Sequence, residues 1–305
     1  MRARTHLRIW LACAVALSAH GPAHARPRQG VTPPDWTPPA TRKAKTPFAP
    51  RPFGGDNIFK GEAERWLAES VAGNLSVLED EQVAGYVARV GRHLAAHSVA
   101  PAKGYEFFVL EDAEANAMSV GGGRVYVNVG MLKAVESEDE LAGVLAHELA
   151  HDAFGHAAKT VTRQLFWMTG VRRVGAPGEL EDALGRLFAE YEKKPFAAVA
   201  ESLLGFSRFD EAEADRAAFY NTYRAGYNPR ALSAVLQRME REVKGAAGKE
   251  HRRRQFLNLL FGTHPLTSLR TTALSWESNF VKMPKREERR ASAAFDAMKA
   301  RVEKL

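Results

Sequence analysis

Apolar residues recur every three or four positions along several stretches of the 305-residue chain, the spacing of one face of an α-helix. In the most regular stretch these positions form a single stripe: Leu141, Val144, Leu145, Leu149 and Ala153. Ser137, followed three residues later by Glu140, predicts a capping box at the start of this helix. We therefore expect a capped helix that begins just after Ser137 and buries this stripe.

Three further stretches show helical spacing, namely 59–79, 80–98 and most of 160–206. The last contains an apolar run at 195–206, which at about 12 residues is too short to span a bilayer. It predicts a core helix or one that covers a cleft. After Pro284, the segment 284–305 predicts an amphipathic helix that docks on its own domain, with apolar positions at Ala291, Phe295, Met298, Val302 and Leu305.

Residues 105–110 and 124–129 read as strands. The second has one apolar face, at Val125, Val127 and Val129. Gly121-Gly122-Gly123 supplies the flexible turn before it. This strand is either an ordinary buried strand or the edge of a cleft, where an extended substrate adds as a further strand.

These elements together predict an α+β fold that is mainly helical, with a small sheet beside the helix that follows Ser137. The apolar content of 45% suffices for one good-sized domain, which we place at 56–283. The proline-rich segment 26–55 predicts an extended tether without a core. An arm packed over the domain is the alternative.

Candidate chemistry lies on the capped helix, in His147-Glu148-Leu149-Ala150-His151. Residues four apart on a helix are about 400° apart around it and about 6 Å along it, so both imidazoles leave one face. Two neutral imidazoles at this spacing bind one zinc ion, and a neighbouring carboxylate acts on water at that ion. The pattern predicts a zinc-dependent peptidase with Glu148 as its general base.

Catalytic zinc usually takes a third protein ligand and leaves one position open. An unbroken helix turns His156 away from the metal, so we expect it behind the ligands or at the surface. Glu211 and Asp215 share one helical face, where Glu211 would complete the site and Asp215 would accept a hydrogen bond from a ligand His. A solvated acidic helix face is the alternative, and Glu213 is the fallback ligand.

In four ordered segments the chain resembles metallopeptidase family forty-eight, which includes the CAAX prenyl protease and the HtpX-, Oma- and BepA-type proteases. The segments are Asn116 to Ser119 with Gly121-Gly122-Gly123, Ala146 to His151 with Gly155-His156, Glu211 to Asp215, and His264-Pro265 with Arg270. The resemblance covers roughly 60–280 and implies a gluzincin-type zinc metallopeptidase domain. It also implies that the third ligand is Glu211.

In the expected mechanism His147, His151 and Glu211 hold one Zn²⁺ per chain, and Glu148 moves the proton. Three residues are candidates for stabilising the oxyanion: His264, Arg270 and Tyr223. His264 has two alternatives, because it could instead approach the open position of the metal or simply lie in a surface loop.

Residues 1–25 read as a signal peptide, with three arginines, an apolar stretch of about 11 residues and Ala23-His24-Ala25 as the cleavage site. An uncleaved anchor is the alternative. Cys13, the only cysteine, lies within this segment, so an exported, periplasmic protein without disulfides is expected.

Loss of the three signal arginines lowers the formal charge from +7 to +4, which indicates no particular partner. Arg252-Arg253-Arg254 reads as a solvated face, so we expect no nucleic acid. The expected partners are unfolded or misassembled envelope proteins, with no transmembrane segment after cleavage but room for peripheral membrane association. The oligomeric state stays open. The alternative function is a chaperone-like binding protein with a non-catalytic zinc.

Overall fold

The computed structural model describes residues 37–41, 75–101, 104–160, 206–245, 264, 268–280 and 292–305. Several sequence predictions lie outside these residues: the signal peptide, the helix over 59–74, almost all of 160–206, the arginine run at 252–254 and the start of the last helix at 284. None of the described helices is long and apolar enough to cross a membrane.

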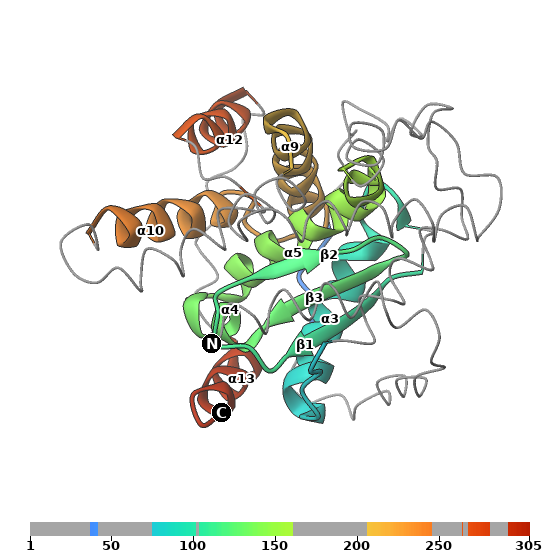
Figure 1. The fold of residues 1–305 in the computed structure, drawn as a ribbon, viewed down its shortest axis with the longest axis vertical. Coiled ribbons are helices and arrows are strands. Elements are labelled where there is room, and N and C mark those ends of the chain that lie inside the picture. Colours follow the sequence, from blue (N-terminus) through green and yellow to red (C-terminus); the bar gives the residue numbers. More distant parts are fainter. Residues whose placement is uncertain are drawn as a thin grey trace, which may run out of the picture.

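A three-stranded sheet of β1 (Glu106–Leu110), β2 (Ala117–Ser119) and β3 (Arg124–Asn128) lies at one side of the described fold (Figure 1). Its order is β1-β3-β2, with β3 parallel to β1 and antiparallel to β2. Gly121, Gly122 and Gly123 all have positive φ, at 92°, 66° and 81°, which glycine adopts without steric cost. They form the predicted turn between β2 and β3.

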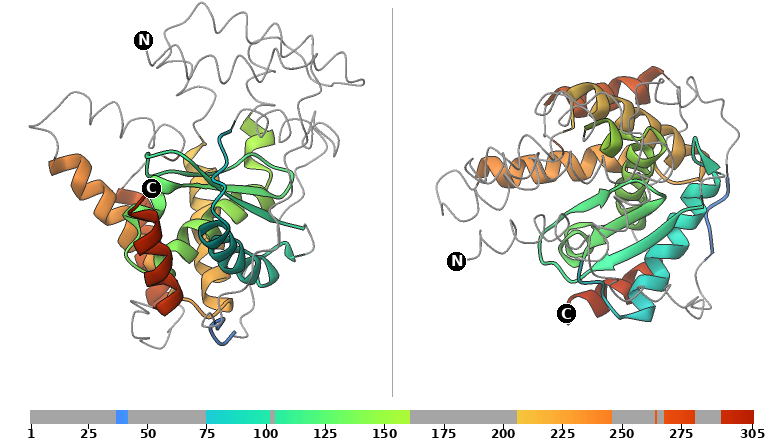
Figure 2. Two further views of the ribbon diagram at one scale, coloured as in Figure 1. Left: turned by 90° about the horizontal axis from the view of Figure 1, so that it is seen from below. Right: turned by 45° about the vertical axis from the view of Figure 1, so that its right-hand side comes forward.

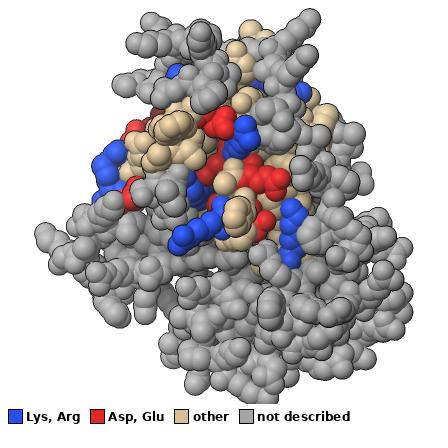
Figure 3. Space-filling view, turned by 90° about the horizontal axis from the view of Figure 1, so that it is seen from above, with Lys and Arg blue, Asp and Glu red and all other residues tan. Residues whose placement is uncertain are grey.

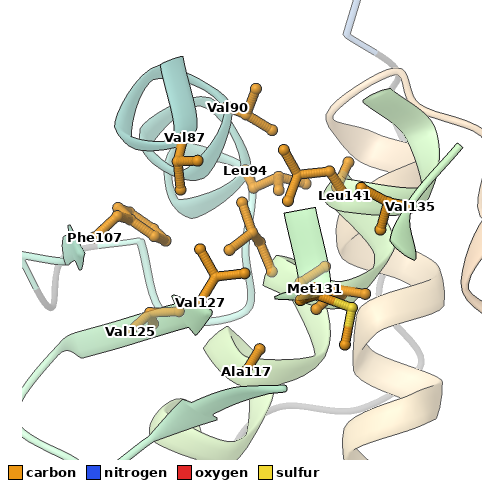
Figure 4. Close-up of a cluster of buried hydrophobic side chains, with 14 of the residues drawn as sticks. Val87, Val90, Leu94, Phe107, Ala117, Val125, Val127, Met131, Val135 and Leu141 are labelled. Atoms are coloured by element: carbon orange, nitrogen blue, oxygen red, sulfur yellow. The ribbon is translucent and has the colours of Figure 1, made fainter. Parts of the chain in front are cut away.

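Both faces of the sheet are buried. Val125 and Val127 of β3 and Phe107 of β1 point into the main core, whereas Tyr126 and Leu110 join a smaller cluster on the other face. The alternation predicted for β3 is therefore confirmed. Figure 4 shows where the main core lies: valines and Leu94 of one helix meet the sheet residues and the helices that follow β3.

The helices that build this core are α3 (Glu81–Ala96), α4 (Val129–Ala134), α5 (Glu138–Ala153), α9 (Arg208–Arg224), α10 (Ala231–Gly245), α12 (Ser268–Phe280) and α13 (Ala293–Val302). α13 packs on α3 and α4, far from α12, the described helix before it (Figure 1 and Figure 2). Phe295, Met298 and Val302 of α13 are buried there, but Leu305 is 54% exposed and does not continue the predicted stripe, because the helix ends at Val302.

α5 is the central helix, and residues 138–152 are buried on every side. Three carboxylates begin it, and each contacts another part of the chain. Glu138 accepts from Tyr86 at 2.7 Å, Asp139 accepts from the backbone N–H of Asn228 at 2.8 Å, and Glu140 pairs with Arg238 at 2.5 Å. These contacts fix the start of α5, while the positive end of its dipole favours the negative charges.

Ser137 caps α5 as predicted, since its hydroxyl accepts from the backbone N–H of Glu140 at 3.2 Å. The reciprocal half of the expected box differs. The Glu140 carboxylate accepts from the backbone N–H of Glu136, at 2.8 Å, because it also reaches toward Arg238. α5 therefore begins where the sequence places it, but Glu140 accepts from the backbone N–H of Glu136 and not from that of Ser137.

Of the two alternatives for the second strand, the structure favours the ordinary buried strand, because β3 is the central strand of the described sheet and β2 lies at the cleft side. One other prediction is corrected. Residues 75–79 are not helical: Val77 forms an antiparallel bridge with Leu110, and the N–H of Leu78 donates to the carbonyl of Val109 at 2.8 Å. The unpaired edge of β1 draws this segment into extended pairing.

Within the proline-rich segment the structure describes 37–41, and Pro39 is buried there. A Cβ built on Gly226, whose φ is 89°, would collide with the Ala40 carbonyl, so the two backbones touch. For these residues the structure favours the packed arm over a free tether. The described chain is thus a mainly helical α+β fold with a small sheet, as predicted.

On the face seen in Figure 3, the described Lys and Arg side chains lie among Asp and Glu side chains. The described part of this face therefore carries both signs of charge side by side.

Candidate metal centre

Two imidazoles of α5 face each other at the heart of the fold. The Nε2 atoms of His147 and His151 are 3.0 Å apart, and the two rings are tilted by 72°. Both residues are almost fully buried, at 4% and 1% exposure. The helical spacing that the sequence shows therefore brings their nitrogens to one point.

α9 lies across α5 and brings the acidic pair to the same point. Ser207 and Asp210 form a complete capping box that begins α9, and Glu211 follows in its first turn. Small residues meet where the helices cross, since Ala150 of α5 packs with Ala214 and Ala217 of α9. This close crossing leaves the Glu211 oxygens 3.5 Å from each of the two Nε2 atoms.

His264 completes a group of four side chains whose candidate ligand atoms all lie within 4.8 Å of one another: His147, His151, Glu211 and His264. Its Nδ1 lies 2.9 Å from Glu211 Oε1 and 3.4 Å from His147 Nε2. Its other nitrogen is 3.7 Å from Glu148. His264 is thus part of the candidate site and not a residue of a distant surface loop.

The spacing of these atoms fits a zinc ion. Ligand bonds of 2.0–2.1 Å in a tetrahedron place the ligand atoms about 3.3 Å from one another. The distances of 3.0 Å between the two imidazole nitrogens and 3.5 Å from each to Glu211 scatter around this value. Two nitrogens and a carboxylate are also a ligand set that zinc prefers.

Behind His147 stands a charged, buried support. Its Nδ1 lies 3.1 Å from Asp215, an ion-pair contact rather than a well-aligned hydrogen bond. Arg270 of α12 donates to both oxygens of Asp215, at 2.7 Å each, and its third nitrogen is 2.8 Å from Glu211. Arg270 therefore joins the two α9 carboxylates.

Behind His151 stands another imidazole. α5 ends at Ala153, Gly155 takes a positive φ of 65°, and the turn brings His156 Nδ1 to 2.9 Å from His151 Nδ1. His156 is fully buried, with its other nitrogen 3.2 Å from Glu213. Of the two alternatives for His156, the structure favours the place behind a ligand, because the helix breaks before it.

The pKa values of the two candidate imidazole ligands, His147 and His151, are shifted in opposite directions. Burial lowers the pKa of His147, but the carboxylates of Asp215 and Glu211 outweigh this and raise it to about 9. Burial and the neighbouring His147 hold the pKa of His151 well below its ordinary value. Burial raises the pKa of Glu211, yet the charges of His264, His147 and Arg270 leave it well below the ordinary value, so Glu211 stays ionised.

Glu148 lies at the same place but outside the ligand group. It is 3% exposed, and its Oε2 atom has no hydrogen-bond partner in the described part of the chain. A buried carboxylate oxygen without a partner is costly, which is typical of a functional site. Tyr223, by contrast, lies about 12 Å further along α9 than Asp215 and packs on the main core.

One residue of the site, Phe206, was not assigned from the sequence. Phe206 stacks on His151, with ring centroids 4.2 Å apart, and lies 5.2 Å from the His264 ring. It ends the apolar run for which we expected a core or cleft-covering helix. Glu213, the fallback ligand, contacts His156 and Lys159.

A cleft opens beside the group, lined by His147, Glu148, His264 and Arg270 together with apolar residues of α4, α5 and α10. β2 borders it through Ala117 and the preceding Asn116. Ser119 and Gly123 donate to Asp152, at 3.1 and 3.0 Å, and so tie the β2–β3 turn to α5. A buried group of candidate ligand atoms therefore borders a cleft that is partly open to solvent.

Comparison with known proteins gives the relatives of this chain. It is 25% identical over 181 residues to the beta-barrel assembly-enhancing protease of Escherichia coli, covering 57% of this chain and 36% of that protein. It is 31% identical over 164 residues to the mitochondrial metalloendopeptidase OMA1 of Schizosaccharomyces pombe, covering 54% and 46%. It is 26% identical over 166 residues to the metalloprotease YcaL of Escherichia coli, covering 54% and 61%.

In each of these comparisons the chain spans less than two thirds of the relative. The family profile covers more: the one described as peptidase family M48 matches residues 81–278, which run from α3 to α12 and include the whole candidate metal centre. The chain belongs to peptidase family M48.

Proposed function

We propose that this chain is a zinc-dependent endopeptidase that hydrolyses unfolded or misassembled proteins of the cell envelope. The observation that carries the proposal is the triangle of His147, His151 and Glu211, whose edges fit tetrahedral zinc. Glu148 stands beside this triangle with a buried, unpartnered oxygen. When bound there, one zinc ion per chain supplies Lewis-acid activation of water and of the scissile carbonyl.

Glu148 moves the proton in this mechanism. It takes a proton from the attacking water and passes it to the nitrogen of the leaving amine. His147 and His151 hold their nitrogens in place, with Asp215 behind the first ring and His156 behind the second. β2, the cleft-side strand, offers an edge on which an extended substrate adds as a strand.

Arg270 and His264 were both candidates for stabilising the oxyanion. The guanidinium of Arg270 is engaged by Asp215 and Glu211, so a positioning role for those carboxylates suits it better. His264 has one nitrogen at the ligand group and the other toward Glu148. Its Nδ1 would therefore be a fourth ligand for a zinc ion held by His147, His151 and Glu211, and it would have to move away before water or substrate enters.

The position of His264 also supports the second candidate function. A structural zinc is normally closed by four protein ligands. If His264 stays at the metal, the chain is a chaperone-like binding protein for the same substrates, with a non-catalytic zinc. The names of two relatives, an assembly-enhancing protease and a metalloendopeptidase, favour the peptidase.

The cellular location is also part of the proposal. A signal peptide at 1–25 would deliver the chain to the periplasm, where it would meet unfolded envelope proteins and lie close to membranes. The relative named for enhancing β-barrel assembly supports this choice of substrate class.

The test combines metal content with cleavage of casein as an unfolded substrate. We expect about one zinc per chain, loss of cleavage with a chelator, and its return with zinc. Glu148→Gln should keep the metal and abolish cleavage, because the amide cannot take the proton. Glu136→Gln, the same change at a 70% exposed side chain, is the matched control and should leave cleavage unchanged.

Two outcomes would overturn the proposal. Unchanged cleavage by Glu148→Gln would remove its catalytic role. Tight casein binding by the zinc-loaded native chain without any cleavage would establish the binding protein instead.

A further inference from the structure

A buried carboxylate stands directly after the second imidazole of the candidate metal centre and takes no part in the proposed mechanism. Asp152 follows His151 near the end of α5 and is 1% exposed. The last turn of a helix carries a partial negative charge, so the helix dipole disfavours a carboxylate there. Burial adds to this cost unless the carboxylate accepts hydrogen bonds. Asp152 therefore does not stabilise α5 by itself, and what it contributes lies in its contacts with the sheet.

Two donors from the sheet meet one oxygen of Asp152. The hydroxyl of Ser119, the last residue of β2, donates to Oδ2 at 3.1 Å, and the backbone N–H of Gly123 donates to the same atom at 3.0 Å. The Ser119 oxygen in turn accepts from the N–H of Gly121 at 3.4 Å. Hydrogen bonds to an ionised acceptor are stronger than those between neutral groups. Asp152 thus holds the end of β2 and the turn behind it against α5.

The turn between β2 and β3 needs such a hold. It is built from three successive glycines at positive φ, and glycine loses more conformational freedom on folding than any other residue. Asp152 fixes the N–H of Gly123, while the carbonyl of Gly123 accepts from the N–H of Glu106 in β1 at 2.8 Å. Gly123 is therefore held between α5 and the sheet. Without the contact to α5, the glycines would let β2 shift relative to the metal centre.

β2 turns the main chain of Ser119 toward its outer edge. The N–H of Asn128 donates to the carbonyl of Asn116 at 2.9 Å, so these residues form a hydrogen-bonded pair of the antiparallel ladder. Such pairs alternate with pairs whose N–H and C=O point away from the partner strand. Ser119, three positions after Asn116 and opposite Val125, belongs to the outward set. The residue that Asp152 holds by its side chain therefore presents its main chain to the outer edge of β2.

We propose that Asp152 is a positioning residue for the substrate: through Ser119 and Gly123 it fixes the outer edge of β2 relative to the helix that holds the metal. This inference rests on the proposed peptidase function, in which an extended substrate adds to β2. The main chain of the substrate is then fixed at two places, at β2 and at the metal. Asp152 joins these places because it is the neighbour of His151. It acts through β2 and not by contact with the reacting atoms.

The first test measures kcat and KM of the zinc-loaded chain for a fluorescence-quenched peptide that spans one of the cuts in casein. Asp152→Ala should raise KM about tenfold and leave kcat within about twofold, because a displaced edge weakens the binding of substrate and transition state alike. Ser119→Ala, which removes one of the two donors, should raise KM about threefold. Asp152→Asn should restore most of the loss, since its amide oxygen still accepts both hydrogen bonds.

Asp139→Ala is the matched control. Asp139 is a buried carboxylate at the opposite end of α5, 2% exposed, and accepts from the backbone N–H of Asn228 at 2.8 Å. Its loss should lower the free energy of unfolding, as the loss of Asp152 does, but should leave KM unchanged. Zinc affinity, measured with a chromophoric chelator, should stay within about threefold in every variant, well below the effect of losing a partner of a metal ligand.

The second test needs no cleavage. Two peptide hydroxamates are titrated into the zinc-loaded chain, one with ordinary amides and one whose amides are N-methylated and cannot donate to a strand edge. The native chain should bind the first about tenfold more tightly. Asp152→Ala should reduce this ratio to about twofold, because its β2 edge no longer lies in register with the metal. Asp139→Ala should preserve the ratio.

The results separate the two proposals. If Asp152→Ala leaves KM and the hydroxamate ratio as they are in the native chain, the positioning role is refuted and the peptidase stands. A fall of about tenfold in the zinc affinity of Asp152→Ala would assign the residue to the metal instead and would also refute it. If casein is not cleaved, the peptidase falls, while the hydroxamate ratio still decides on Asp152.

Far-ultraviolet circular dichroism checks that each variant is folded. If Asp152→Ala does not fold, Ser119→Ala carries both tests, because it keeps the carboxylate and loses a single donor. Equal affinities of the native chain for the two hydroxamates would refute the role of the β2 edge, and with it the role of Asp152.

Discussion

The two imidazoles that open the candidate metal centre come from one helix, yet the fold supports them in opposite ways. Behind His147 lie Asp215 and Arg270, both buried and charged, on α9 and α12. Behind His151 lies His156, which leads to Glu213, whose side chain is 41% exposed. The charged, buried residues behind His147 should therefore contribute more to stability and zinc affinity than the residues behind His151. Water and salt screen the charge of Glu213, because its side chain reaches the surface.

The largest effect is expected for Arg270→Met. Removing this buried guanidinium leaves Asp215 and Glu211 without the cation that joins them. We expect a loss of about 3–5 kcal/mol in the free energy of unfolding, measured by urea denaturation of the metal-free chain.

Arg270→Lys sharpens this prediction, since it keeps the charge but loses the two-pronged contact with Asp215. The free energy of unfolding of Arg270→Lys should lie between those of the native chain and of Arg270→Met. A loss for Arg270→Met within the range of ordinary surface substitutions, about 0.5 kcal/mol, would contradict the buried pairing.

The next effect is on metal affinity, in Asp215→Asn. The amide keeps the shape of the side chain but removes the negative charge behind His147. Zinc affinity, measured by competition with a chromophoric chelator, should fall about 10–100-fold. Asp296→Asn, an exposed change on α13, is the control and should leave the affinity as it is.

His156→Ala tests the other support and should cost less, about tenfold in zinc affinity, at the lower end of the range for such partners. The lost contact is one between two imidazoles, at 2.9 Å, and carries no full charge. Should this variant bind zinc as poorly as Asp215→Asn, the contrast between the two supports would be refuted.

The smallest effect is expected for Glu213→Gln. This half-exposed side chain contacts His156 at 3.2 Å and also lies 3.8 Å from Lys159. Because water and salt screen its charge, zinc affinity should change by less than about threefold. A much larger change, persisting at high salt, would place Glu213 among the groups that fix the site.

The residues around the two imidazoles also differ in how far the sequence predicts their positions. His147 and His151 are four residues apart, as are Glu211 and Asp215, so helical geometry alone gives each pair a common face. His156 is different: an unbroken helix points it away, and only the turn at Gly155 returns it to His151. That turn depends on where α5 ends, which periodicity locates poorly.

Arg270 shows a second limit. The sequence singled it out through a family resemblance and suggested a contact with the oxyanion. In the fold it reaches two carboxylates that lie 55 and 59 positions earlier in the chain. No local pattern shows which charges a buried guanidinium will meet, because that depends on how α12 packs against α9.

By itself, the sequence determined the elements and the chemistry that each one presents. Capping residues and apolar spacing mark the helices, and the HExxH spacing places two nitrogens on one face, since these are properties of a single turn or strand. Tertiary structure alone decided which faces meet. Small residues let α9 cross α5 closely enough to bring Glu211 to the imidazoles, and glycine lets α10 wall the cleft, because such contacts depend on shapes distant in the chain.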